Sequence, residues 1–441
     1  MKKDEPVAPS DVAQTSETGS AGGPARAELV LSVNGRRLWS RLQEMADVGA
    51  MPESDGGGIS RPSFGPAHAE AVRKVAGWMR EAGLEVGLDA TGNLIGLLRG
   101  RDADEPAIGV GSHLDTVPNG GAFDGALGVL AALEAVQTMA ERGERPRHSV
   151  AVLGFADEEG NTFGIGVLSA QLWCDEIPPE GYGELVDAEG RTLIERVAAF
   201  DVADVPAVER PRLRAYVEAH VEQGPVLEQG GRRAAAVESI VGIARSTVVF
   251  RGIANHAGTT PMEARRDASW AGSELVLAVR ELALASGGLL VGTVGVFEVS
   301  PGATNVVPGS VRLRVELRSA DPDLLQKTSR AVDLAAATAA ERHGLGLETA
   351  AWHVAPPVAM DTTIFSAICH AIEGAGLPRY SMPSWAGHDA KVMARHLPTG
   401  MVFVPSIAGV SHAPDERTDA EDCAIAAEIL RRTILRLDVV A

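Results

Sequence analysis

The sequence predicts an α/β protein whose catalytic domain is interrupted by a smaller α+β domain. A strand, a helix and a second strand over residues 107–155 are typical of a crossover connection in an α/β sheet. Alternating strands and two helices over about residues 241–350 then change the pattern, and helix and strand return after them. At 441 residues the chain is longer than one hydrophobic core usually supports, so we expect two domains.

The chain divides into three expected parts. Residues 1–25 carry small polar and acidic residues without the apolar stretch of a signal peptide, which predicts a disordered tail. Residues 26–240 and 351–441 are expected to form the catalytic, metal-binding domain. Residues 241–350 are expected to form the inserted domain, which serves as a lid and a dimerisation surface.

Apolar periodicity and Gly residues predict the elements of the first half of the chain. We expect a helix from about residue 28 to Gly49, a helix over 67–81, a hairpin over 84–100, strands over 106–115 and 148–155, and a helix over 125–142 closed by Gly143. Both of these strands end where His or acidic residues begin. Because sites in α/β sheets lie beyond the carboxyl ends of the strands, these residues are candidates for chemistry.

The same periodicities predict the elements of the second half of the chain. Strands are expected over 246–252, 290–299 and 310–319, helices near 264–285 and 321–343, and a returning helix and strand over 361–374 and 399–406. Two helices with three or more alternating strands form an α+β module in which the helices cover one face of a sheet.

Composition excludes several classes of partner. There are 40 basic and 59 acidic residues, and the net charge of −19 repels nucleic acid and anionic membrane surfaces. The three Cys residues form no CxxC pair, which favours a cytoplasmic protein without a disulfide framework. The sequence contains no uninterrupted apolar run of about 18 residues, so no membrane span is predicted.

His113 and Asp124 flank a Pro/Gly-rich turn and are candidate metal ligands. Imidazole and carboxylate suit zinc, manganese or cobalt, and Asp115 can hold the second nitrogen of His113. Each residue also has a structural alternative. His113 can be a buried histidine bonded to backbone, and Asp124 can cap the helix that starts at Gly125.

Glu158 and Glu159 follow Asp157 at the end of an apolar strand. Three consecutive acids usually form a solvated loop. A bound cation, however, relieves the repulsion between neighbouring carboxylates, so that one can bind metal while the other holds a proton.

His220 and His412 complete the candidate ligands. Both lie in Gly/Pro-bounded loops beside carboxylates rather than on apolar helix faces. A lone histidine is more often structural, and Glu222 and Glu416 beside them can be ordinary surface acids.

Further residues are candidates for binding substrate. His256 and Asn305 lie in turns, and Gly387 precedes His388 and Asp389 in another loop. Alternation places Arg318 on one strand face with Arg312, Arg314 and Glu316. A guanidinium is a natural partner for a substrate carboxylate, although this face can equally be a solvated one.

Seven ordered motifs now carry a family resemblance. They are GSHLDTVPNGGAFDGALGVL, GFADEEG, HVEQGP, ANHAGTTPM, TNVVPG, AGHDA and SHAPDE. From about Leu38 to the C-terminus the chain resembles the amidohydrolases that cleave N-carbamoyl-L-amino acids and allantoate. That family is a branch of the dinuclear aminoacylase and carboxypeptidase-like metallopeptidases, so a mixed-sheet catalytic domain is implied.

The resemblance implies a role for each candidate. His113 and His220 would bind one metal ion, Glu159 and His412 the other, and Asp124 would bridge both, with Glu158 as general base and Asp115 behind His113. His256 would reach into the site of the partner subunit in a homodimer. Asn305 and Arg318 would hold the substrate carboxylate, and Gln223 and Gly387 would line the pocket.

The implied reaction is hydrolysis of the ureido C–N bond of a small ureido acid, with two divalent ions per subunit. Manganese and zinc are the first choices, and cobalt and nickel remain possible. Allantoate, ureidoglycolate and N-carbamoyl-β-alanine are alternative substrates, and an aminoacylase, a dipeptidase and a metal-free binding protein are more remote readings. Two departures from the family pattern bear on substrate choice: Asn161-Thr162-Phe163 after Gly160, and Glu316 where an Asp commonly stands.

Overall fold

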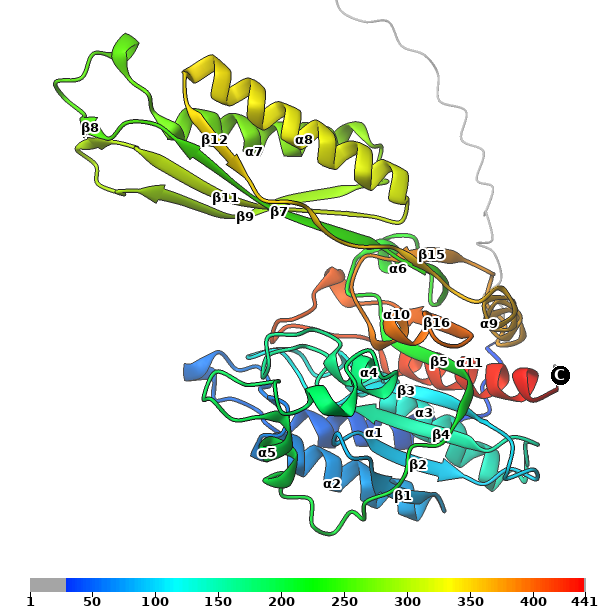
Figure 1. Cartoon of the computed structure of the whole chain (residues 1–441). Helices are drawn as coiled ribbons and strands as arrows, with labels where there is room; N and C mark the ends of the chain where they lie inside the picture. Colours follow the sequence, from blue (N-terminus) through cyan, green and yellow to red (C-terminus); the bar gives the residue numbers. More distant parts are fainter. Residues whose placement is uncertain (1–28, 440–441) are drawn as a thin grey trace, which may run out of the picture.

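The computed structural model describes residues 29–439, so the predicted tail over residues 1–25 lies outside the described part. The described chain forms two lobes, one around a nine-stranded sheet and one around a five-stranded sheet (Figure 1). The expected α/β fold with a mixed sheet is confirmed. No helix within residues 29–439 has the length and apolar character needed to cross a membrane.

The nine-stranded sheet has the order β1-β2-β4-β3-β5-β16-β6-β14, with β15 also paired to β6. Its strands are β1 (Glu85–Leu88), β2 (Leu94–Leu98), β3 (Ala107–His113), β4 (Val150–Phe155), β5 (Leu213–Val221), β6 (Ala235–Ile240), β14 (Val358–Ala359), β15 (Ser381–Ser384) and β16 (Thr399–Val404). The four central strands β4, β3, β5 and β16 run parallel. Every residue of β3, β4 and β16 is buried, which is why their sequences are continuous apolar runs rather than alternating ones.

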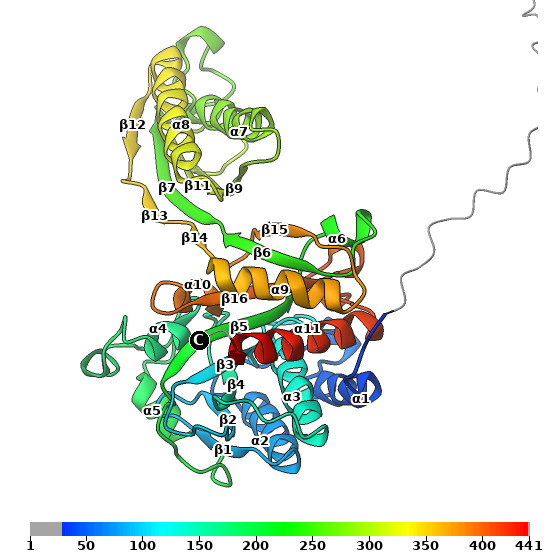
Figure 2. The same cartoon turned by 90° about the vertical axis from the view of Figure 1, so that its right-hand side faces the viewer.

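Helices cover both faces of this sheet. They are α1 (Gly35–Ala46), α2 (Pro66–Glu81), α3 (Ala126–Glu141), α4 (Leu168–Trp173), α5 (Leu193–Ala198), α6 (Val226–Gln229), α9 (Thr362–Gly374), α10 (Asp389–Met393) and α11 (Ala420–Val439). On one face, α3, α9 and α11 pack with Val110, Val152 and Val217 in the main core. Figure 2 shows α9 and α11 side by side there. On the other face, Phe155 and Tyr216 pack in a second core.

The five-stranded sheet has the order β12-β7-β11-β9, with β13 also paired to β7. Its elements are β7 (Gly242–Arg251), β9 (Val291–Ser300), β11 (Ser310–Ser319), β12 (Gly346–Thr349), β13 (His353–Ala355), α7 (Ala268–Ala285) and α8 (Pro322–His343). Both helices lie on one face of the sheet over a core of its own (Figure 1). The alternating burial along β11 confirms that Arg312, Arg314, Glu316 and Arg318 share the opposite face. The boundaries at residues 240 and 350 stay a prediction, and β13 continues the sheet beyond residue 350.

A short ribbon of β8 (Asn255–His256) and β10 (Val306–Val307) lies at the end of this lobe farthest from the nine-stranded sheet (Figure 1). Short 3-10 turns occupy residues 53–55, 179–181, 262–264 and 407–409.

The first helix begins later than the predicted start near residue 28. It starts at Gly35, and the Asn34 side chain caps it by accepting from the backbone N–H of Arg37. The preceding backbone is committed elsewhere, because Val30 N–H donates to the carbonyl of Ala375 and Ser32 N–H donates to the carboxylate of Glu428. Long-range partners therefore replace helical ones in an apolar stretch that periodicity alone favours as helix.

Candidate active site

The candidate ligands gather at the carboxyl edge of the parallel strands. His113 is the last residue of β3, and His220 is the last residue but one of β5. Glu158 and Glu159 follow β4, and His412 follows β16 after a short loop. Parallel strands present the same end to one edge of the sheet, which brings these separate segments together.

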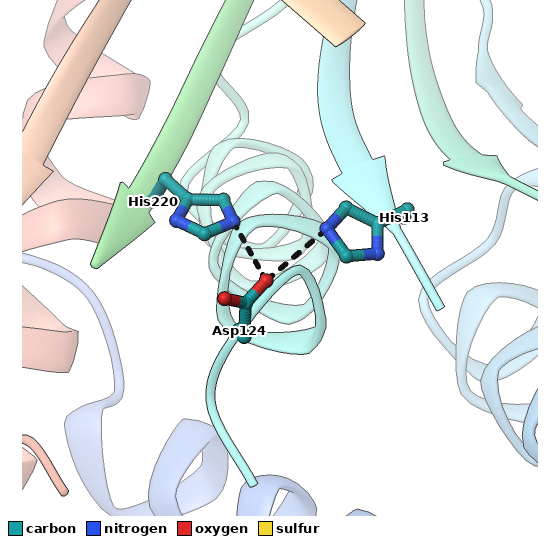
Figure 3. A group of neighbouring side chains, drawn as sticks. All are labelled: His113, Asp124 and His220. Carbon is teal, nitrogen blue, oxygen red and sulfur yellow. Dashed lines mark ion pairs between the residues drawn. The ribbon is translucent and has the colours of Figure 1, made fainter. Parts of the chain in front are cut away.

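Asp124 is the centre of the cluster. Figure 3 shows the imidazoles of His113 and His220 pointing from two neighbouring strands at one oxygen of Asp124, at 3.3 and 3.2 Å from Oδ1. Nε2 of His412 lies 3.3 Å from the other oxygen, Oδ2. Each carboxylate oxygen therefore faces different imidazole nitrogens, as expected of a carboxylate that bridges two cations with separate histidine ligands.

The hydrogen bonds of the two buried imidazoles test whether a metal suits this arrangement. Nδ1 of His113 lies 3.0 Å from the carbonyl of Asp115, and Nδ1 of His220 lies 2.9 Å from the carbonyl of Val221. A carbonyl only accepts, so each Nδ1 carries the proton. Nε2 is then the atom of each ring that faces Asp124, and the N–H of Gly125 also donates to Nε2 of His220. Both rings keep their Nδ1 hydrogen bonds when Nε2 binds a metal ion in place of a proton, so the arrangement fits a cation between the rings and the carboxylate.

A second group of possible ligands adjoins the first. Nε2 of His412 lies 3.7 Å from Oε1 of Glu159, and that oxygen is buried without a hydrogen-bond partner among the described residues. Three sets of side chains offer ligand atoms within 4.8 Å of one another: His113, Asp124 and His220; His113, Glu158 and Glu159; and Asp124, Glu159 and His412. The structure thus contains a candidate His/Asp/Glu metal-binding cluster.

The electrostatics of the cluster follow from burial and from its mutual contacts. Burial disfavours the charged form of Asp124, but His220, His113 and His412 outweigh it and hold the pKa of Asp124 well below its usual value. Burial raises the pKa of Glu158 well above its usual value, and burial followed by the charge of Asp124 raises the pKa of Glu159 to about 7. Glu158 is therefore a carboxylate suited to holding a proton.

Asp115 orients the carboxylate loop. Its two oxygens accept the backbone N–H groups of Glu158 and Glu159, at 3.2 and 3.1 Å, and Oδ1 also lies 3.3 Å from Nδ1 of His113. Asp115 therefore connects the end of β3 to the loop after β4.

The helix-cap alternative for Asp124 is not what the structure shows. The residue at the cap of α3 is Gly125, with φ of 65° and no side-chain hydrogen bond. A Cβ at Gly125 would lie 2.4 Å from Cε1 of His113, so only glycine allows the imidazole to pack against this turn. The carboxylate of Asp124 is left free to face the imidazoles.

Reading Glu222 and Glu416 as surface acids is wrong, since they are 8% and 3% exposed. Glu222 accepts the N–H groups of Val226 and Leu227 at the start of α6. Glu416 accepts the N–H groups of Phe123 and Asp124, at 2.8 and 2.9 Å, and so holds the ligand turn from beneath. Its position four residues after His412 is the only sequence signal for this role.

Gln223 and His412, which contact Asp124, both have left-handed backbones, with φ of 61° and 55°. Such conformations cost about 1 kcal/mol or more each, and they persist at sites where side-chain direction matters. Here both side chains reach Asp124. The amide nitrogen of Gln223 donates to Oδ2 of Asp124 at 2.6 Å, and Nε2 of His412 lies 3.3 Å from the same oxygen.

A cavity of about 670 Å³ opens in front of the cluster. Among its lining residues are His113, Asp124, Glu158, Glu159, His220, Gln223, Arg318, Gly387 and His412. Arg318 reaches it from β11 of the other lobe, where Glu316 and the carbonyl of Trp385 hold its guanidinium at 2.7 and 2.8 Å. The pocket therefore lies between the two lobes and combines residues of both.

His256 and Asn305 do not line this cavity. They are neighbours in the ribbon at the far end of the five-stranded lobe, where the N–H of Ala257 donates to the carbonyl of Asn305 (Figure 1). His256 is exposed, and its Nδ1 accepts the N–H groups of Gly258 and Thr259. Because Nδ1 accepts, Nε2 carries the proton and is a hydrogen-bond donor.

Comparisons with known proteins agree with the fold and the motifs. The chain is 41% identical over 409 residues to the N-carbamoyl-L-amino acid amidohydrolase of Geobacillus stearothermophilus, covering 92% of this chain and 99% of that protein. It is 34% identical over 398 residues to the allantoate amidohydrolase of Escherichia coli (strain K12), covering 90% and 96%. The crystal structure of an amidase of the hydantoinase/carbamoylase family from Burkholderia multivorans superposes with a TM-score of 0.85 at 34% identity, covering 91% of this chain and 97% of that one.

The family model of Peptidase family M20/M25/M40 matches residues 109–436, a span that runs from β3 into α11 and includes every candidate ligand. The resemblance inferred from the motifs is thereby confirmed, together with the metallopeptidase-like fold. The chain belongs to Peptidase family M20/M25/M40.

Proposed function

We propose that the protein is a metal-dependent amidohydrolase that cleaves the ureido C–N bond of an N-carbamoyl-L-amino acid or a related ureido acid. The products would be the amino acid, ammonia and carbon dioxide. The relatives at 41% and 34% identity support this reaction class through the names they carry. The strongest structural support for this function is that the ligand cluster, the buried carboxyl of Glu158 and the guanidinium of Arg318 all line one cavity.

The ligand assignment divides the cluster into two metal sites. His113 and His220 would hold one divalent ion, Glu159 and His412 the other, and Asp124 would bridge them, in accord with the sides of Asp124 that these residues face. Manganese or zinc fits this set of nitrogen and oxygen ligands, as do cobalt and nickel. When bound, the metal supplies Lewis acidity that makes water a nucleophile at neutral pH.

Glu158 is proposed as the general base. Its buried carboxyl group takes a proton from the attacking water and returns it to the departing nitrogen, and its raised pKa suits a group that both accepts and donates. Asp115 is a positioning residue for Glu158 through the backbone hydrogen bond between them.

Arg318 is proposed to bind the substrate carboxylate. The ion pair with Glu316 aims its guanidinium, and the remaining N–H groups can pair with a carboxylate. Gln223 and the Gly387 loop form the neighbouring walls. These contacts would place the ureido carbonyl beside Glu158.

The site is proposed to be completed in a homodimer. His256 and Asn305 lie outside their own cavity, while the edge strand β9 and helix α7 expose apolar residues, among them Leu277, Leu284 and Phe297. A two-fold contact along this edge would bury them and pair the free edge of β9. The partner's copy of the ribbon would then bring Nε2–H of His256 to the developing oxyanion.

Allantoate is the second candidate substrate, favoured by the 34% identity to an allantoate amidohydrolase. Ureidoglycolate, N-carbamoyl-β-alanine and the N-acyl or dipeptide substrates of an aminoacylase or dipeptidase are further alternatives. A cytoplasmic location belongs to the proposal and is supported by the three free cysteines.

A metal analysis combined with a substrate panel tests the function. The purified protein, reconstituted with manganese or zinc, is assayed on N-carbamoyl-L-amino acids, allantoate, ureidoglycolate, N-carbamoyl-β-alanine and dipeptides. Ammonia release from ureido acids and no cleavage of dipeptides is the expected result. Cleavage of dipeptides alone would contradict the proposal.

A further inference from the structure

The lining of the cavity includes several cations besides the ligand cluster. The cavity that His113 and Glu158 line is also lined by Arg245 of β7, Arg318 of β11, Lys391 of α10, and Arg395 just after α10. Three separate elements thus direct basic side chains into one space.

The carboxylates around these cations do not balance them. Arg245 and Arg318 share the single carboxylate of Glu316, at 2.6 and 2.7 Å. Arg395 has its own partner in Glu176, through two hydrogen bonds of 2.8 and 2.7 Å. Glu316 therefore leaves one of its two arginines without a compensating charge.

Lys391 adds a second unbalanced charge. It is 7% exposed, and Nζ donates to the carbonyl of Val241 at 2.7 Å. Within residues 29–439 no carboxylate forms an ion pair with it. An ammonium has three donors, so the remaining ones can serve a ligand.

The four cations also act on one another. Burial, and after it the charges of Arg395, Arg318 and Arg245, lower the pKa of Lys391 to about 8. An anion that enters the cavity relieves both effects. One substrate carboxylate, bound at Arg318, compensates only one of the two surplus charges.

We propose that Arg245 and Lys391 form a second anion subsite, and that the preferred substrates are ureido dicarboxylates such as N-carbamoyl-L-aspartate and N-carbamoyl-L-glutamate. This inference rests on the proposed hydrolysis of ureido acids. The α-carboxylate pairs with Arg318, and the side-chain carboxylate lies toward Lys391. A neutral side chain leaves the second positive charge unpaired, which selects against it.

Matched pairs of substrates test the subsite. N-carbamoyl-L-aspartate is compared with N-carbamoyl-L-asparagine, and N-carbamoyl-L-glutamate with N-carbamoyl-L-glutamine, at pH 7, where Lys391 is charged. The ratio of kcat/KM, acid over amide, is expected to be about ten or more for at least one pair. It should fall as salt is added.

Lys391→Met removes the charge and keeps an unbranched side chain, and the ratio should then fall by about tenfold. Arg312→Met is the matched control. Arg312 lies on the same face of β11 as Arg318 but does not line the cavity. Removing its positive charge should therefore leave the acid-to-amide ratio unchanged. The unmodified enzyme offers the same comparison of acid with amide, since L-aspartate should inhibit it more strongly than L-asparagine does.

The outcomes separate the two proposals. Turnover of the neutral substrates with acid-to-amide ratios near one overturns the subsite and leaves the proposed function standing. A ratio that survives Lys391→Met also overturns the subsite. No hydrolysis of any ureido acid contradicts the proposed function itself.

Discussion

The carboxyl edge of the nine-stranded sheet and the tip of the five-stranded lobe carry two parts of the predicted site, and they are built differently. At the sheet edge, His113, His220 and Asp124 are buried and contact one another. At the tip, His256 is exposed, its strand pairs within residues 29–439 only with the short β10, and its ring accepts hydrogen bonds from its own loop. The local sequence is similar at the two places, because His113 lies beside a Gly-rich turn and His256 lies within a Gly-containing one.

A histidine motif therefore identifies a kind of chemistry but not the chain that supplies its partners. A buried cluster gathers its ligands from strands of one sheet. At the exposed ribbon, the proposed homodimer would supply the partners of His256. Substitutions on each side of this contrast should have effects of different size.

Replacing Glu158 by Gln tests the buried side most severely. The amide cannot take a proton, so kcat should fall by about 10² to 10⁴, while bound metal measured by elemental analysis stays near that of the parent. Glu70→Gln, at an exposed position on α2, is the control and should leave kcat unchanged. Retained turnover in Glu158→Gln would remove Glu158 from the mechanism.

Replacing His256 by Asn tests the exposed side. Asn keeps an acceptor for the N–H groups of Gly258 and Thr259 but removes Nε2–H, so kcat should fall by about 10² if this group stabilises an oxyanion. Metal content should not change.

Mixing Glu158→Gln subunits with His256→Asn subunits sharpens the same test. In a randomly mixed two-fold dimer with shared sites, half of the dimers regain one intact site, which restores about a quarter of the parent activity. Activity that stays at the level of the separate variants would show that His256 does not act across subunits.

Arg318→Ala tests the contact between the lobes. Loss of the guanidinium should raise KM for a ureido acid by about tenfold or more and leave metal loading unchanged. Arg312→Ala, on the same strand face but away from the cavity, is the control. An unaltered KM in Arg318→Ala would exclude it from substrate binding.

His68 is a buried imidazole whose surroundings disfavour its charged form, through burial first and then through the charges of Arg61 and His113. Burial lowers its pKa from 6.5 to about 4, so below pH 6.5 the unfolded chain binds a proton that the folded chain does not. The free energy of unfolding should therefore fall by about 3 kcal/mol as the pH drops from 6.5 to 4. Denaturant titrations should show a shallower pH dependence in His68→Asn, whereas the exposed His370→Asn should match the parent.

Much of the fold could be predicted because its signals are local. The continuous apolar runs of β3 and β4 and the apolar positions of α3 are visible in single segments, and their boundaries agree with the structure within a few residues. The first helix was placed too early because the partners of Val30 and Ser32 lie hundreds of residues away. Periodicity cannot register such contacts.

The candidate site was predictable to the same extent. Residue type and strand-end position singled out His113, Asp124, Glu158 and His220, and the structure brings them together. The sequence leaves the surface-acid alternative for Glu416 open, because the two N–H groups that Glu416 binds belong to a turn nearly 300 residues earlier.

Sequence alone determined the chemistry available to this protein, because donor atoms and strand or helix patterns are properties of short segments. It also determined the family, through seven motifs in a fixed order. Tertiary structure decided which donors share a site, since parallel strands bring distant residues to one edge of a sheet. It alone placed Arg245, Arg318 and Lys391 in one cavity and His256 outside it, because only packing between lobes sets those distances.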